Sequence, residues 1–173
     1  RIDKRIKYIC KKNEGPGAAR NMGFSLATYS YITFVDGDDW IEPDMYQEVA
    51  TMIERFYPDV VVSEFYSEFD THTEVGNQIF SDESYTKEEL NTKIYPRMLF
   101  NGRFYQFGVN PNCWSKVFKK ELFEKHLPQV DTRTKMGEDA AFTYPCMLDA
   151  NHICYISKPL YHYRIGVSSM SRG

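Results

Sequence analysis

Tyr31-Ile32-Thr33-Phe34-Val35 leads directly into Asp36-Gly37-Asp38-Asp39-Trp40, so that an apolar stretch ends in three carboxylates. Five consecutive β-branched and aromatic residues predict a buried strand. In open α/β sheets, ligands bind just beyond the carboxyl ends of such strands. The three acidic residues therefore stand where a functional site is expected.

The acidic cluster needs a positive counterpart. Two like charges about 4 Å apart repel by roughly 4 kcal/mol at an effective dielectric constant near 20. Carboxylate oxygens are suited to hard divalent cations, so we expect Mn²⁺ or Mg²⁺ at this point. A second interpretation is a loop of acids that caps a helix beginning near Pro43, in which Asp39 and Glu42 would do no more than stabilise that helix.

Composition and charge restrict the class of protein. The 173 residues are typical of one domain with a substantial core. The net charge of −3 gives no indication of a nucleic-acid partner. No apolar stretch is long enough for a membrane span. A basic cluster near the start could contact an anionic membrane or substrate, or could be a solvated face: Arg1, Lys4, Arg5, Lys7, Lys11 and Lys12.

The four cysteines are too scattered for a Cys-x-x-Cys motif and are ordinary for a reduced cytoplasmic chain. We expect all four to fill the core: Cys10, Cys113, Cys146 and Cys154.

Local patterns predict strands alternating with helices, which favours a parallel α/β sheet. Thr86 followed by Glu89 is a capping box that begins one of the helices. Residues 64–84 have no clear period and predict an irregular hairpin. The expected strands are 6–10, 31–35, 59–63, 153–156 and 160–164, and the expected helices are 18–28, 43–56, 87–101, 119–126 and 138–149.

Several motifs follow one another in the order found in a known family. Residues 13–23 precede the first quoted strand and its acidic end, and three motifs follow: Trp114-Ser115-Lys116-Val117-Phe118, Gly137-Glu138-Asp139 and Tyr161-His162-Tyr163-Arg164. Together they resemble the middle of a family 2 glycosyltransferase. The resemblance implies an α/β fold of the GT-A class, Rossmann-like, with a mixed but mostly parallel sheet flanked by helices. Family members begin with a strand, a helix and a second strand that this sequence lacks, so we expect an N-terminally truncated catalytic domain.

The resemblance also implies how this domain is divided and how its donor is bound. Residues 1–173 would form a single GT-A fragment, with a donor and metal half at 1–45 and an acceptor-side half at 46–173. Asp38 and Asp36 would bind the metal, and His162 would complete its ligand set. Asn13, Arg20, Asp36 and Arg164 would contact the donor. The alternatives are a structural ion pair between Arg20 and Asp36 and a structural His162.

The second half would supply the catalytic and acceptor residues. Asp139 would be the general base that takes the proton of the acceptor hydroxyl, and Glu138 would position the acceptor or tune that base. Trp114 and Lys116 would contact the acceptor. The alternatives are acids that favour a helix N-terminus at 138–139 and, for Trp114, packing in the core.

The function implied is inverting, metal-dependent transfer of a sugar from a nucleotide-sugar, expected to be a UDP-sugar, to a hydroxyl of a glycan or lipid-linked acceptor. The process would be bacterial surface polysaccharide biosynthesis, in the cytoplasm, with peripheral attachment to the inner membrane face left open. One alternative is a haloacid dehalogenase-like phosphatase with Asp36 as nucleophile, although Trp40 stands where Thr or Val is usual. The other is a truncated, non-catalytic binding domain.

Overall fold

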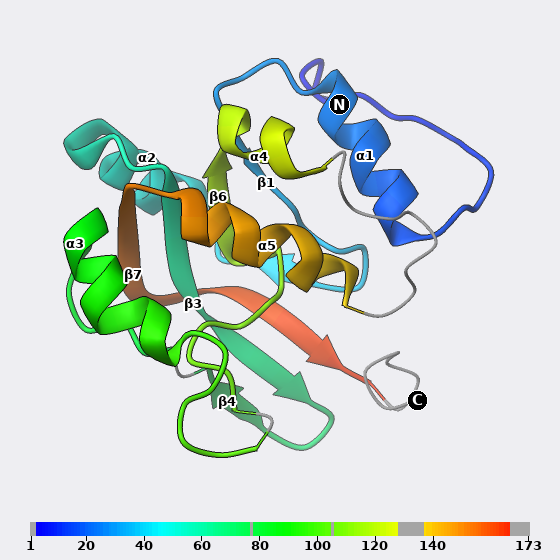
Figure 1. Cartoon of the computed structure of the whole chain (residues 1–173). Coiled ribbons are helices and arrows are strands. Elements are labelled where there is room, and N and C mark those ends of the chain that lie inside the picture. The colour runs from blue at the N-terminus through cyan, green and yellow to red at the C-terminus, as the bar shows by residue number, and fades with distance from the viewer. Residues whose placement is uncertain (1–2, 77, 105, 128–136, 167–173) are drawn as a thin grey trace.

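The computed structural model describes residues 3–76, 78–104, 106–127 and 137–166, and these form a mixed sheet with helices on both faces (Figure 1). The sheet has the strand order β1-β6-β3-β7-β2, with β4 paired to β3 and β5 paired to β7. The strands are β1 Tyr31–Thr33, β2 Trp40–Ile41, β3 Val60–Phe69, β4 Thr73–Val75, β5 Ser84–Thr86, β6 Lys116–Lys119 and β7 His152–Ile165.

The helices agree closely with the expected ranges, apart from the one that begins after Thr86. They are α1 Pro16–Leu26, α2 Met45–Phe56, α3 Lys87–Glu89, α4 Lys120–His126 and α5 Glu138–Asp149, with a π-helical turn at Leu90–Ile94 and a 3₁₀ turn at Tyr95–Arg97. The expected helix over 87–101 changes character because Pro96 has no N–H to continue the α-helical ladder.

The mixed α/β sheet is confirmed, but the expectation that it is mostly parallel is wrong for the described strands. Only β3 and β7 pair in parallel, and the other five pairings are antiparallel. The reason is that β6 runs antiparallel between β1 and β3. β1 and β3, which lie on either side of α2 in the chain, therefore do not pair directly with each other.

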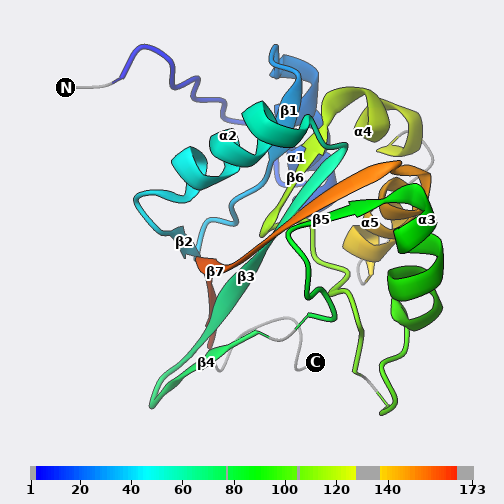
Figure 2. The same cartoon turned by 90° about the vertical axis from the view of Figure 1, so that its left-hand side faces the viewer.

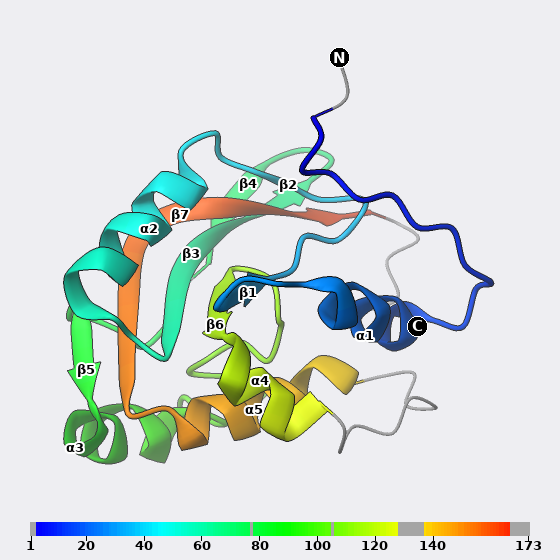
Figure 3. The same ribbon diagram turned by 90° about the horizontal axis from the view of Figure 1, so that it is seen from above.

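Alternating side chains of the sheet pack against helices on both faces. Val60 and Val62 of β3 lie in one apolar cluster with residues of α4 and α5, whereas Val61 lies in a second cluster with Met45, Val49 and Met52 of α2. Figure 3 shows α2 on one side of the sheet and α4 and α5 on the other. Both faces of the central strands are thus buried. The acidic residues of the expected site follow the C-terminal end of β1.

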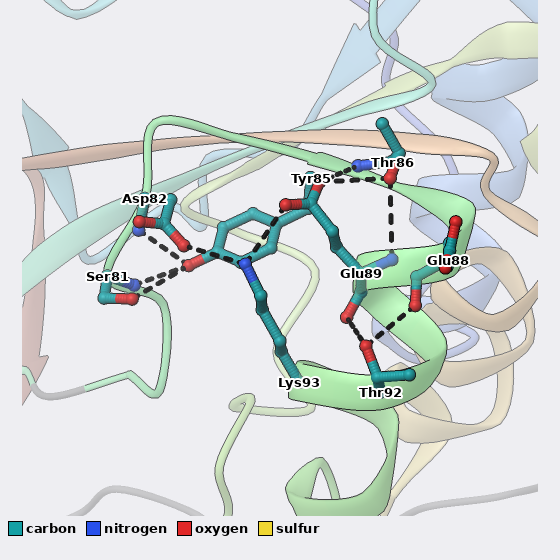
Figure 4. A network of polar contacts seen from close by, with 8 residues as sticks. All are labelled: Ser81, Asp82, Tyr85, Thr86, Glu88, Glu89, Thr92 and Lys93. Atoms are coloured by element: carbon teal, nitrogen blue, oxygen red, sulfur yellow. Dashed lines mark hydrogen bonds and ion pairs between the residues drawn. The ribbon is translucent and has the colours of Figure 1, made fainter.

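The capping box before α3 is confirmed. The Thr86 side chain accepts a hydrogen bond from the backbone N–H of Glu89, and the Glu89 carboxylate accepts one from the backbone N–H of Thr86 at 3.0 Å (Figure 4). Hydrogen bonds from Thr86 and then from Lys93 lower the pKa of Glu89 to about 2. This network fixes the turn between β5 and α3 at the edge of the core.

The strands β3 and β7 are longer than the sequence pattern predicts. Residues 64–69 continue β3 into a hairpin with β4, which projects past the rest of the sheet in Figure 2. The two strands expected at 153–164 are one strand, β7, whose register with β3 shifts where Glu64 faces Pro159. Because proline cannot donate a ladder hydrogen bond, an irregularity is expected there.

Two expectations about the start of the chain are wrong. Residues 6–10 form no strand, and Ile6 and Tyr8 are 66% and 89% exposed. Apolar and basic residues alternate there, but a ladder also needs a partner strand, and the described residues offer none. Cys10 is exposed as well, whereas Cys113, Cys146 and Cys154 are buried as predicted. Within the described ranges, no helix is long and apolar enough to cross a membrane.

Candidate active site

Arg20 lies at the centre of the candidate site. Its helix, α1, begins with Pro16 directly after Gly15, whose φ of 90° is a conformation that glycine adopts readily. Asn13 prepares this start, since its side-chain oxygen accepts a hydrogen bond from Gly15 N at 3.1 Å. The helix carries the Arg20 side chain, which is 12% exposed and contacts the loop that follows β1 and the start of α5.

The Arg20 guanidinium joins carboxylates from two distant parts of the chain. Its Nη2 donates to Asp36 Oδ1 at 3.0 Å, and its Nη1 donates to Asp139 Oδ1. Glu138 Oε1 lies 3.5 Å from the same Nη1. Burial by itself would lower the pKa of Arg20, but the negative groups around it, Asp139 and Asp36 among them, raise it above its ordinary value.

Asp139 is held from a second direction. Its Oδ2 accepts a hydrogen bond from the backbone N–H of Cys113 at 3.2 Å. Glu138 and Asp139 occupy the first turn of α5, where the helix dipole favours negative charge. The helix-terminus interpretation is therefore correct for their position, and the contact with Arg20 adds a connection that a cap alone does not explain.

The charges around Arg20 do not balance. One guanidinium faces Asp36, Glu138 and Asp139, whose side chains are all partly buried. Asp38 stands two residues from Asp36 and is exposed, and within the described residues its carboxylate has no hydrogen bond or ion pair. An additional cation would relieve this excess of negative charge.

His162 lies in different surroundings from those predicted. Its ring is stacked between Trp40 and Tyr66, with centroids 4.8 and 4.7 Å away. Its Nδ1 lies 2.7 Å from Glu68 Oε1, and its Nε2 lies 3.1 Å from Glu42 Oε1. Both nitrogens are thus engaged by carboxylates other than Asp36 and Asp38, so we do not retain His162 among the metal ligands. Glu42 likewise has a partner in this cluster.

Arg164 shares a face of β7 with His162, as the alternation in the sequence predicts. Its guanidinium carbon lies 5.3 Å from the centroid of the Trp40 ring, which in turn stacks on His162. A cation over an indole face is a favourable arrangement. Donor contacts of Arg164 and Asn13 stay predictions, because the observed contacts of both residues are within the protein.

Trp114 and Lys116 are buried, which contradicts their expected role as direct acceptor contacts. The Trp114 ring stacks on Tyr161 and on Tyr163, each with its centroid 4.8 Å away. Lys116 is fully buried, and its Nζ donates to the backbone and side-chain oxygens of Asn112 at 2.8 and 3.3 Å. The burial of both side chains favours the core interpretation of Trp114 over direct acceptor contact.

The family model for glycosyl transferase family 2 matches residues 1–127. The chain belongs to this family. Family 2 membership agrees with the motif order and removes the support for the phosphatase alternative. The matched segment contains Arg20 and the acidic cluster after β1, while Glu138 and Asp139 lie beyond it.

Relatives extend the likeness across family 2. The putative glycosyltransferase EpsH of Bacillus subtilis is 33% identical over 172 residues, which is 98% of this chain and 47% of EpsH. The glycosyltransferase GlyA of Streptococcus pneumoniae is 33% identical over 171 residues, covering 99% of this chain and 24% of GlyA. The chain thus spans half or less of the length of these relatives.

A solved structure shows the fold. TarS residues 1–349 of Staphylococcus aureus, in complex with UDP-GlcNAc, superimposes with a TM-score of 0.70 at 21% identity, covering 92% of this chain and 42% of that one. The expected GT-A class is therefore confirmed for the arrangement of sheet and helices.

Three contacts at the site were missed by sequence reasoning. They are the Cys113 backbone amide on Asp139, the pair of Asn112 with Lys116, and the bond between Tyr161 and Asp39. A backbone amide leaves no trace in a sequence. Asp39 did carry a signal, because a third acid in a row of carboxylates needs a hydrogen-bond donor of its own when it is partly buried.

Proposed function

We propose that the protein transfers a sugar from a nucleotide-sugar, in particular a UDP-sugar, to a hydroxyl of a glycan or lipid-linked acceptor, with inversion at the anomeric carbon and with a divalent cation. The observation that carries the proposal is the Arg20 cluster. It joins the carboxylate at the end of β1 with the carboxylate pair at the start of α5. The carboxylates that we assign to the donor side and to the acceptor side therefore contact the same Arg20 guanidinium.

Asp36 and Asp38 fit a cation that is shared with the donor. The described part of the chain has no group of three or more His, Cys, Asp or Glu side chains that could hold a metal by themselves. Mg²⁺ usually binds through one or two carboxylates together with substrate phosphates. Asp38, exposed and without a protein partner among the described residues, is the carboxylate best suited to this role. When bound, the cation would offset the charge of the diphosphate leaving group.

Asp139 and Arg20 would divide the remaining work. Asp139 takes the proton of the acceptor hydroxyl while that oxygen attacks the anomeric carbon, and the bonding electrons leave with the diphosphate. Both Asp139 oxygens already accept a hydrogen bond, Oδ1 from Arg20 and Oδ2 from the backbone N–H of Cys113. We therefore propose that Arg20 exchanges its bond with Asp139 for one with the donor phosphates when the substrates bind, which frees Asp139 Oδ1 for the acceptor hydroxyl. A single base and no separate nucleophile give inversion.

The wider setting rests on relatives and on charge. TarS is named a poly(ribitol-phosphate) β-N-acetylglucosaminyltransferase and was crystallised with UDP-GlcNAc, which supports a UDP-sugar donor and a polymeric acceptor. We propose bacterial surface polysaccharide biosynthesis as the process. We place the reaction in the cytoplasm at the inner membrane face, where the basic residues among the first twelve would contact anionic lipid.

The proposal is tested with substitutions in the full-length protein. Asp139→Asn should keep the affinity for UDP-sugar and Mn²⁺ but lower kcat by about 10²- to 10⁴-fold, the range for loss of a general base. Asp38→Ala should abolish the Mn²⁺-dependent part of nucleotide binding, measured by calorimetry. Asp70→Asn, at an exposed loop position, is the matched control and should change neither quantity.

Two outcomes would refute these assignments. Turnover of Asp139→Asn at the parent rate would exclude Asp139 as the base. Equal affinity of Asp38→Ala and parent, with and without Mn²⁺, would exclude Asp38 as a metal ligand. Nucleotide binding by the full-length protein but not by residues 1–173 alone would favour the truncated-domain alternative for this chain.

A further inference from the structure

The hydroxyl of Tyr161 connects β7 to the acidic loop. Tyr161 is fully buried, and its hydroxyl accepts a hydrogen bond from the backbone N–H of Asp36 at 3.1 Å. The same hydroxyl donates to Asp39 Oδ2 at 2.6 Å. One phenol oxygen therefore contacts both the first and the last acid of the cluster that follows β1.

Those two acids are the ends of a tight turn. The backbone N–H of Asp39 donates to the carbonyl of Asp36 at 3.2 Å, which closes a four-residue turn with Gly37 and Asp38 at its tip. Asp39 is also tied to β7, because its Oδ1 accepts a hydrogen bond from the backbone N–H of Arg164 at 2.9 Å. The turn that presents Asp38 is thus fixed at both ends to one strand.

The surroundings hold this phenol in place. The Trp114 ring stacks on Tyr161 with an interplanar angle of 13°. The hydroxyl accepts from Asp36 and donates to Asp39, so both of its hydrogen-bonding roles are used within the turn. Trp114, unsuited to direct acceptor contact, thereby acquires a supporting role.

We propose that Tyr161 is a positioning residue, whose hydroxyl holds the turn over residues 36–39 in the conformation in which Asp36 and Asp38 bind the cation and donor diphosphate. The inference rests on the proposed function for the role of these two carboxylates. The clamp itself depends only on the contacts of Tyr161 with Asp36 and Asp39.

Tyr161→Phe removes the hydroxyl and keeps the ring, and Tyr155→Phe is the matched control. Tyr155 is also a buried tyrosine of β7, and its hydroxyl donates to the Glu64 carboxylate at 2.5 Å, outside the acidic turn. Both variants lose a bonded buried hydroxyl, so both should be somewhat less stable than the parent. Measurements well below both unfolding midpoints separate this shared effect from a local one.

The first measurement is hydrogen exchange of the amides at residues 36–40 in the full-length protein. Tyr161→Phe should exchange there about tenfold faster than the parent, as expected when a turn loses the bond that fixes it, and Tyr155→Phe should match the parent at these amides. Unchanged exchange in Tyr161→Phe, or equal acceleration in both variants, would overturn the clamp whether or not the protein is a transferase.

The second measurement is calorimetric binding of UDP with Mn²⁺. Tyr161→Phe should bind about tenfold or more weakly, and Tyr155→Phe should bind like the parent. Faster exchange combined with parental affinity would overturn the positioning role. If the parent itself shows no Mn²⁺-dependent binding of UDP, UDP is not the nucleotide of the donor or the metal role is wrong. In that case the proposed function fails, while the exchange experiment still decides the clamp.

Discussion

Arg20, which is 12% exposed, and Lys116, which is fully buried, are cations with opposite surroundings. Arg20 is bonded to the carboxylates of Asp36 and Asp139, and these charges outweigh burial and raise its pKa. Lys116 is fully buried, and its Nζ donates to the two oxygens of Asn112, which are neutral. Burial lowers the pKa of Lys116 to about 7, and more distant negative groups oppose that change only in part.

The difference in surroundings corresponds to a difference in role between Arg20 and Lys116. Arg20 remains charged and links the groups that we assign to chemistry, whereas Lys116 binds the segment beside them. Asn112, the partner of Lys116, directly precedes Cys113, whose backbone N–H holds Asp139. The lysine that the motif suggested as an acceptor contact thus fixes the loop that orients the proposed base.

Removal of the Arg20 charge is expected to have the largest effect on stability. Arg20→Met would leave Asp36, Glu138 and Asp139 close together and partly buried without their cation. Loss of one partner of a fully buried ion pair typically costs about 3–5 kcal/mol. Because the three carboxylates are 18–35% exposed, we expect a smaller loss of unfolding free energy, measured by urea denaturation. Arg20→Lys should recover only part of it, because an ammonium cannot donate to both carboxylates in the fork geometry of a guanidinium.

Arg55→Met is the control for this experiment. Arg55 also pairs with a carboxylate, that of Glu83, but the side chains of Arg55 and Glu83 are 61% and 50% exposed. Exposed pairs contribute little, so this variant should have nearly parental stability. An equal loss in Arg20→Met and Arg55→Met would mean that the Arg20 cluster is no more important to the fold than a surface ion pair.

Lys116→Met is expected to change the pH dependence of stability. The folded pKa of Lys116, about 7, lies below the value of 10.5 for an unperturbed lysine. Between these two values the unfolded chain binds the proton and the folded chain does not, so this residue makes the parent more stable as pH rises. Below pH 7 both states are protonated, and the full cost of the buried charge is present.

The parent should therefore gain stability relative to Lys116→Met from pH 7 to pH 9, by at most about 1.4 kcal/mol per pH unit. Unfolding free energies of both proteins at pH 6, 7.5 and 9 provide the measurement, and other titrating groups cancel in the difference. A difference that stays constant with pH would contradict the lowered pKa and would place Lys116 in the same class as Arg20.

The sequence predicted the elements with a strong local signal. The apolar stripe of α2, with Val49 and Met52 on its buried face, follows from helical spacing, and the capping box at Thr86 marked the start of α3 correctly. Asp36 and Asp139, proposed on motif order, are brought together by the structure through Arg20. Each of these predictions depends on a pattern within a few residues or on the order of motifs along the chain.

What the sequence could not predict depends on neighbours in space. No local sequence pattern indicates that the carboxylates of Glu42 and Glu68 contact the two ring nitrogens of His162. Nothing in residues 6–10 states whether a partner strand is present. The insertion of β6 between β1 and β3 depends on the packing of the whole sheet, and local period cannot reveal it.

Glu64→Gln should have the smallest effect and tests whether a carboxylate near Lys116 stabilises it as Asp139 stabilises Arg20. Glu64 Oε1 accepts hydrogen bonds from Tyr155 OH and from Gln78 N, and an amide oxygen could accept both. Burial raises the pKa of Glu64 above its ordinary value. The unfolded chain therefore releases this proton first as pH rises past 4.5, and the parent loses stability over that window.

Glu64→Gln lacks this titration, so its stability relative to the parent should rise as the pH increases above 4.5. The double variant with Lys116→Met measures the coupling of the two residues directly. A large coupling would show that Lys116 is also held by an ion pair. A small coupling would leave Arg20 as the cation of this pair whose charge depends on the carboxylates of the proposed site.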